Sequence, residues 1–283
     1  MLSRLFCFSK VYLGILILIS SLIITVGSQL INTSKLNHNF LGNRVQKKTW
    51  WVGHKSVSKN ISILVMAGHA DSQGIEGSGT EGEAVALKGS SPMDFRISDE
   101  LFWNLAVRDA VVALGERKGL NISAYDPGIR TIIDSNNELT NWSVGAQHAN
   151  KGGYPLEIHF DSYGQYGFGS GLIPPLSTQI NSIDEALARS FGRYPIFFRG
   201  GLGGPRRQIR ILEIGKLEGS LERKLRDVNS REQALDAIAH KIIDAILIGI
   251  NNNFSFNQQL NKGHIFMKDS HQLTNHTIYN HIL

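Results

Sequence analysis

The chain has one cysteine, Cys7, among its 283 residues. A single thiol excludes an intramolecular disulfide and any zinc cluster built on several cysteines. The sequence also lacks an internal repeat, a helix-turn-helix, a zinc finger and a stripe of alternating basic and aromatic residues. The common nucleic-acid-binding modules are therefore not expected, although the net charge is +5. The glycine-rich segment 200–207 lacks the Lys-Ser/Thr pair of a phosphate-binding loop.

What is present is an ordinary globular composition. Hydrophobic residues make up 42% of the chain and charged residues 19%, which excludes wholesale disorder, a collagen helix and a disulfide scaffold. A chain of this length can bury a sizeable core in one domain or two, and one domain is the better interpretation. The net positive charge fits an anionic partner. Because no nucleic-acid-binding motif is present, we expect this partner to be an acidic polymer.

The N-terminus has the layout of a targeting segment. Arg4 and Lys10 precede a nearly continuous apolar run over 11–26, which small residues follow. This order predicts a secretory signal peptide over 1–28, with a tilted, uncleaved membrane anchor as the alternative, because the run is shorter than the ~20 residues that usually span a bilayer. We therefore expect an exported protein of the periplasm or cell envelope, in contact with the membrane only through this segment.

Two polar stretches flank the body of the chain. Residues 29–55 are mixed and polar, which predicts a linker, and residues 251–283 are rich in Asn and His, which predicts a loosely ordered tail. The histidines of the tail have no regular spacing and no flanking carboxylates, so a polar tail explains them better than a metal site. The body that should fold is therefore 56–250.

The body alternates strand-like and helix-like stretches. Strands are predicted at 61–66, 121–125, 156–160 and 209–213, and helices at 98–119, 182–191 and 230–250. The first helix should begin at Ser98, a good N-cap, and end at Gly119. This alternation predicts an α/β domain with a mixed, mainly parallel sheet flanked by helices. In such sheets the chemistry lies at the carboxyl ends of the strands.

Ionisable residues stand at the ends of three predicted strands. His69 follows the first strand, His159 ends the third, and Glu213 ends the fourth. A lone histidine at a strand end is more often structural, but three such residues should meet at one edge of the sheet. Two histidines and a carboxylate suit catalytic zinc, which takes three protein ligands and a water, and a further carboxylate would then act as general base.

Four segments carry a recognisable pattern. They are AGHADSQGIEGSGTEGE after the first strand, DELFWNLAVRDAVVAL with Glu100 four residues before Asn104, EIHFDS around His159, and ILEIGKLEGSLERKL at 211–225. In this order the segments resemble the zinc-dependent N-acetylmuramoyl-L-alanine amidases of the amidase 3 type. The last segment is the most specific match. The resemblance covers about 60–250, as in a divergent member of that family.

The resemblance implies a function and a site. The substrate would be peptidoglycan, and the bond cleaved would be the amide that joins N-acetylmuramic acid to L-alanine of the stem peptide. Zn²⁺ would be held by His69, Glu100 and His159. Glu213 would take a proton from the attacking water and pass it to the leaving amine. Another zinc amide hydrolase or peptidase, or a non-catalytic amidase-like protein that binds the cell wall, is the alternative.

The chain also departs from the family pattern. Residues 84–98 look inserted before the helix, so Glu81 and Glu83 are alternatives to Glu100 as the carboxylate ligand. Glu100 is preferred, because helix register is rigid whereas loops absorb insertions. Asp161 stands where the family has Asn, and Asp71 and Asp161 are candidates for orienting the histidines. The segment 164–175 is expected to be an irregular loop that shapes the cleft.

Overall fold

The computed structural model describes residues 38–46, 51–176 and 179–251. The strands are β1 (Ile63–Ala67), β2 (Ile122–Tyr125), β3 (Tyr154–Asp161), β4 (Gly171–Ile173) and β5 (Arg210–Lys216). The α-helices are α2 (Gly82–Ala86), α3 (Asp99–Arg117), α4 (Asn141–Asn150), α5 (Ser182–Phe191), α6 (Gly203–Arg206), α7 (Gly219–Arg226) and α8 (Arg231–Asn251). Short 3-10 turns are η2 (His38–Leu41), η3 (Gly164–Tyr166) and η4 (Phe198–Gly200).

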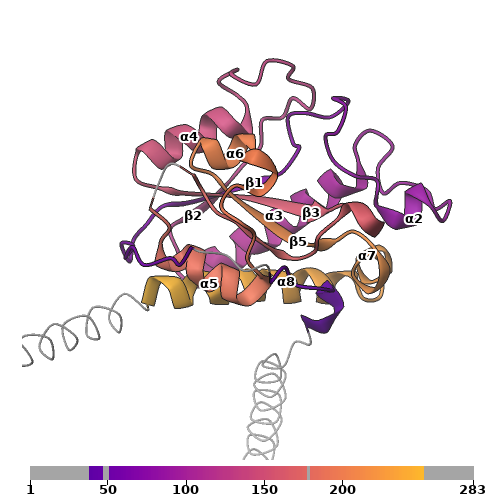
Figure 1. Cartoon of the computed structure of the whole chain (residues 1–283). Coiled ribbons are helices and arrows are strands. Elements are labelled where there is room, and N and C mark those ends of the chain that lie inside the picture. Colours follow the sequence, from indigo (N-terminus) through magenta and orange to yellow (C-terminus); the bar gives the residue numbers. More distant parts are fainter. Residues whose placement is uncertain (1–37, 47–50, 177–178, 252–283) are drawn as a thin grey trace, which may run out of the picture. The chain divides into compact units, whose positions relative to one another are not determined.

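The strands form one five-stranded sheet in the order β2-β1-β3-β5-β4 (Figure 1). The first four strands in this order are parallel to their neighbours, whereas β4 runs antiparallel to β5. The predicted mixed, mainly parallel sheet is therefore confirmed. In the register, Ala67 pairs with Ile158, and His159 pairs with Glu213. The carboxyl ends of β1, β3 and β5 consequently lie at the same edge.

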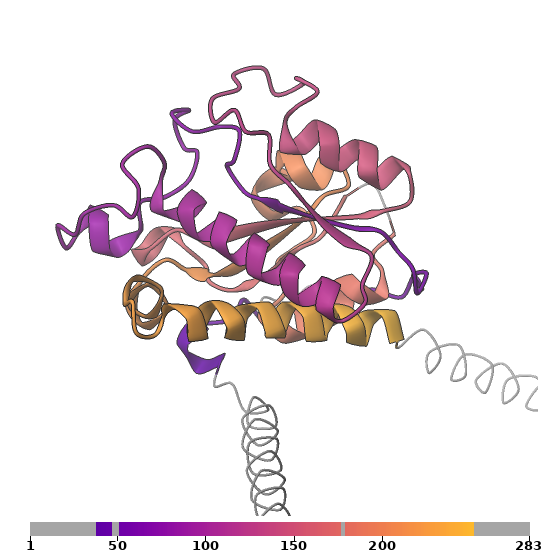
Figure 2. The same cartoon turned by 180° about the vertical axis from the view of Figure 1, so that it is seen from behind.

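Helices cover both faces of the sheet. Helices α4 and α6 lie on one face, and α3, α5 and α8 lie on the other (Figures 1 and 2). Helix α8 packs against both α3 and α5 along most of its length. The larger part of the hydrophobic core therefore lies between the sheet and α8.

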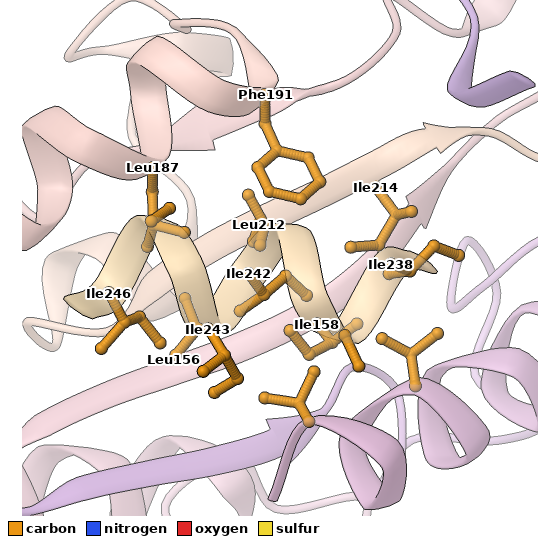
Figure 3. Close-up of a cluster of buried hydrophobic side chains, with 14 of the residues drawn as sticks. Leu156, Ile158, Leu187, Phe191, Leu212, Ile214, Ile238, Ile242, Ile243 and Ile246 are labelled. Atoms are coloured by element: carbon orange, nitrogen blue, oxygen red, sulfur yellow. The ribbon is translucent and has the colours of Figure 1, made fainter. Parts of the chain in front are cut away.

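The apolar stripe of α8 fills this core, as Figure 3 shows. The apolar residues that recur on one face of this helix in the sequence are all buried: Leu235, Ile238, Ile242, Ile246 and Ile250. They pack with side chains of β3 and β5, among them Ile158 and Leu212. A strand that is covered on both faces has a continuous run of apolar residues in the sequence. Strand β1 has such a run, and for this reason it could be predicted.

Truncation of this stripe should be costly. Ile242 is 0% exposed, so the Ile242→Ala variant leaves a cavity and should lower the free energy of unfolding by about 2–5 kcal/mol. Ile248 lies on the same helix but is 51% exposed, so Ile248→Ala should change it by less than about 0.5 kcal/mol. Urea unfolding followed by circular dichroism measures both. Equal losses would contradict the placement of α8.

Local capping fixed most element ends as expected. The Ser98 side chain accepts a hydrogen bond from Leu101 N and begins α3, and Gly119 follows its end with φ 77°. Helix α5 spans the predicted 182–191. The expectation of an irregular 164–175 is wrong in part, because this segment contains β4. Strand β4 has only three residues, one of them glycine, so the sequence shows no strand pattern there.

The predicted linker 29–55 needs a correction in its described part. Leu41, Val45 and Trp51 are only 4–6% exposed, and Trp51 Nε1 donates to the carbonyl of Tyr194 at 2.7 Å. These residues are therefore part of the packed body. The predicted signal or anchor at 1–28 lies outside the described residues, as does the tail after residue 251. Among the described residues, no helix is long and apolar enough to cross a membrane.

Candidate metal centre

His69 leaves the end of β1 in an unusual backbone conformation. Its φ is 62°, in the left-handed region that residues with a Cβ seldom adopt. The residue before it, Gly68, lies against the His159 ring so closely that a Cβ there would stand 2.3 Å from the ring. Asn104 of α3 donates to the Gly68 carbonyl at 3.1 Å. Glycine and this turn together bring the two imidazoles next to each other.

Glu100, in the first turn of α3, completes a group of three. It is 4% exposed, and its Oε2 accepts a hydrogen bond from Thr80 N at 2.9 Å. Its other oxygen, Oε1, lies 3.3 Å from His69 Nε2 and 3.3 Å from His159 Nδ1. The two rings are nearly perpendicular, with centroids 4.7 Å apart. Two imidazole nitrogens thus point at the same side of one buried carboxylate.

This arrangement fits a metal ion. The three ligand atoms all lie within 4.8 Å of one another. Ligands about 2.0–2.1 Å from a tetrahedral zinc ion stand about 3.3–3.4 Å apart, which is close to the separation of Glu100 Oε1 from each imidazole. A donor set of two neutral histidines and one carboxylate is also one that catalytic zinc takes in hydrolases. The group could therefore hold a metal ion, and its donor set is one that suits zinc.

The two alternative carboxylates lie elsewhere. Glu83, on α2, accepts hydrogen bonds from Lys88 Nζ at 2.6 Å and from Gly219 N at 3.1 Å. Glu81 is exposed at the start of the same helix. Neither belongs to the group of three. The structure therefore brings Glu100, rather than Glu81 or Glu83, to the histidines.

Two members of this group, Glu100 and His159, have strongly shifted pKa values. Burial alone would raise the pKa of Glu100, but the interactions with His69 and His159 outweigh it and lower that pKa. Burial alone would likewise lower the pKa of His159, but its contacts with Glu100 and Glu157 raise it well above the usual value. Positive charge is thus strongly favoured beside Glu100. A bound cation would satisfy the same carboxylate and displace the His159 proton.

Glu213 lies directly beside this group on β5. It pairs with His159 in the strand register, and its Oε2 is buried without a hydrogen bond to any described residue. Burial raises the pKa of Glu213 to about 8, against the lowering effect of His159. An unsatisfied carboxylate is costly to bury. Glu213 is therefore better suited to exchanging a proton than to stabilising the fold.

One acidic neighbour was missed in the sequence. Glu157 lies on β3 two residues before His159 and is 3% exposed. Its Oε2 is 3.5 Å from His159 Nε2, and its Oε1 accepts a hydrogen bond from Asn141 Nδ2 at 2.9 Å. The signal was present as a period of two, because Glu157, His159 and Asp161 alternate with apolar residues and so share one face of the strand.

The aspartates considered for orienting the histidines have other partners. Asp71 Oδ2 accepts a hydrogen bond from Asn141 N at 2.7 Å. Asp161 accepts from Gly169 N at 2.8 Å and from Phe168 N. Both carboxylates thus hold backbone turns beside the site. No hydrogen bond joins either of them to His69 or His159 among the described residues.

A cavity of about 460 Å³ opens beside the two histidines. His69, His159 and Glu157 contribute to its lining, together with largely apolar neighbours such as Ile133, Trp142 and Leu202. A cleft with an apolar lining and a few convergent polar groups is the usual form of a small-molecule or polymer-segment site. Two of the three candidate ligands, His69 and His159, are therefore accessible to a substrate from the α4 and α6 side.

The fold and the site define an α/β protein with a His-Glu-His group, suited to a metal, at the carboxyl edge of its sheet. No protein-family model matches the chain, and no curated protein matches it by sequence. Solved structures do show similarity. The catalytic domain of CwlV, an N-acetylmuramoyl-L-alanine amidase from Bacillus (Paenibacillus) polymyxa, is 18% identical, with a TM-score of 0.43 over 66% of this chain and 96% of that one.

Two further amidases show similarity of the same degree. The CwlD amidase of Clostridioides difficile, solved in complex with the GerS lipoprotein, is 19% identical, with a TM-score of 0.40 over 69% of this chain and 98% of that one. The N-acetylmuramoyl-L-alanine amidase AmiC2 of Nostoc punctiforme is 14% identical, with a TM-score of 0.41 over 68% and 97%.

Proposed function

We propose that this chain is a zinc-dependent hydrolase that cleaves the amide bond between N-acetylmuramic acid and L-alanine in peptidoglycan. The observation that carries the proposal is the meeting of His69, Glu100 and His159 beside Glu213, from segments far apart in the sequence. In the resemblance to the amidases, these are the residues expected to serve as metal ligands (His69, Glu100 and His159) and as general base (Glu213). The positive net charge of +5 suits an acidic wall polymer.

In the proposed reaction, His69, Glu100 and His159 hold the metal. Zinc, when bound, polarises the scissile carbonyl and lowers the pKa of a water molecule. Glu213 takes a proton from the attacking water and then delivers it to the departing amine. The cavity beside His69 and His159 admits the substrate segment that carries the amide. Location in the cell envelope follows from the predicted signal or anchor at 1–28, which lies outside the described residues.

The test is digestion of purified peptidoglycan by the zinc-loaded full chain, with products identified by mass spectrometry. The expected product is a free stem peptide that begins with L-alanine, together with glycan strands that keep their lactyl groups. Cleavage within the stem peptide would point to the alternative, a zinc peptidase. Wall binding without cleavage would instead support the non-catalytic alternative.

A further inference from the structure

We propose that Glu157 is a positioning residue that fixes the His159 ring and aims its Nδ1 at the metal. The inference rests on the proposed metal site, but it does not depend on which bond is cleaved. His159 faces Glu100 with Nδ1 at 3.3 Å and Glu157 with Nε2 at 3.5 Å. A carboxylate thus lies on each side of one imidazole, and the Nδ1 side is the one that faces Glu100, the carboxylate of the group of three.

The chemistry of metal-bound histidine requires such a partner. An imidazole that binds zinc through Nδ1 carries its proton on Nε2, and this N–H usually donates to a carboxylate or carbonyl. The Nε2 atom of His159 is buried, so water does not readily serve as that acceptor. Glu157 Oε2 is the adjacent carboxylate oxygen. At 3.5 Å the contact is within ion-pair range, and Nε2 has no hydrogen-bond partner among the described residues.

Glu157 is itself held in place from its other oxygen. Asn141, 1% exposed at the start of α4, donates from Nδ2 to Glu157 Oε1 at 2.9 Å and to the Ala67 carbonyl at 2.7 Å. The backbone N–H of Asn141 donates to Asp71 at 2.7 Å. A continuous set of hydrogen bonds therefore connects the end of β1, helix α4 and the carboxylate behind His159.

This arrangement distinguishes Glu157 from a carboxylate that only fills space. Asn141 and His159 face different oxygens of Glu157, and glutamine at this position would present an oxygen to one of them and an NH₂ donor to the other. It also removes the negative charge that makes His159 a stronger ligand. Partners of this type typically change metal affinity by about 10–100-fold.

The experiment measures zinc affinity by competition with a chromophoric chelator, on the full chain carrying Glu157→Gln or Glu157→Ala. Both variants should bind zinc about 10–100-fold more weakly than the wild type. The visible spectrum of the cobalt-substituted protein should change in both, because the ligand field at His159 changes. Glu76→Gln is the matched control: it removes an equal charge from the same cavity, at an exposed residue without contact to His159, and should leave affinity and spectrum unaltered.

The outcomes separate this inference from the proposed function. The thermal midpoint of each metal-free variant shows whether the chain still folds, and the glutamine variant serves if the alanine variant does not. Zinc affinity within threefold of the wild type in Glu157→Gln, with an unaltered cobalt spectrum, would overturn the positioning role alone. A wild-type chain that binds no zinc would overturn both. Weaker zinc binding in a protein that cleaves some other amide would leave the positioning role intact.

Discussion

The Glu213→Gln variant should bind zinc as the wild type does and lose about 10²–10⁴-fold in kcat. Glutamine preserves the shape of the side chain opposite His159 on β5, but it can neither accept the proton of the attacking water nor deliver one to the amine. Peptidoglycan turnover, with bound zinc measured on the same sample, tests this. Glu232→Gln, an exposed glutamate on α8, is the control and should keep full activity.

The same variant has a second readout in the metal-free protein. The folded pKa of Glu213, about 8, exceeds the ordinary value of 4.5, so between these values the folded chain binds more protons than the unfolded one. Its contribution to stability is therefore present at low pH and is lost as the pH rises towards 8. In Glu213→Gln, the free energy of unfolding should therefore depend less on pH between 4.5 and about 8. Undiminished turnover by the variant would remove Glu213 from the mechanism.

Zinc should stabilise the folded chain, and Glu100 should be needed for it. A ligand at a thousandfold its dissociation constant adds about 4 kcal/mol if it binds only the folded state. Three ligands from separate segments give the unfolded chain little affinity. Thermal unfolding with and without zinc should therefore show a clear rise in Tm for the wild type. Glu100→Gln should lose most of this rise and bind far less than one zinc per chain.

Glu83→Gln is the matched control for the ligand set. Glu83 contacts Lys88 and Gly219 on the surface, so its variant should keep both the zinc and the rise in Tm. The reverse result, with zinc lost from Glu83→Gln and retained by Glu100→Gln, would show that the carboxylate ligand comes from the loop. Removal of zinc from the wild type with a chelator should abolish turnover, and added zinc should restore it.

Much of the fold was visible in the sequence where one strong local signal decided the structure. Helix α8 has an uninterrupted apolar stripe, and α5 starts at Asn181, whose side chain accepts hydrogen bonds from Ile183 N and Asp184 N. Strand β1 is a continuous apolar run. Helix α4 gave no such signal, because only two of its residues, Asn141 and Gly145, are buried. Strand β4 depends on pairing with β5 rather than on its own residues.

The candidate site divides in a similar way. His69, His159 and Glu213 were expected at one edge because each was predicted at or just after the end of a strand. Strands β3 and β5 continue to Asp161 and Lys216, but His159 and Glu213 still pair near the carboxyl edge, and His69 follows β1 there. The choice of Glu100 depended on helix register, while Glu81 and Glu83 lie on a short helix whose position no sequence pattern fixed. Glu157 was missed because its role depends on Asn141, which meets it only in the folded chain. The period of two along β3 places Glu157 on the same face as His159, but it does not reveal this long-range hydrogen bond.

The left-handed backbone of His69 has a consequence for the evolution of the chain. Holding a residue with a Cβ at φ 62° costs on the order of 1 kcal/mol or more. Glycine would adopt this turn without strain, but it would remove an imidazole from the group of three. Stability and chemistry therefore make opposite demands on this one position. The histidine there is a compromise in which the molecule gives up part of a small folding free energy to keep a ligand in place.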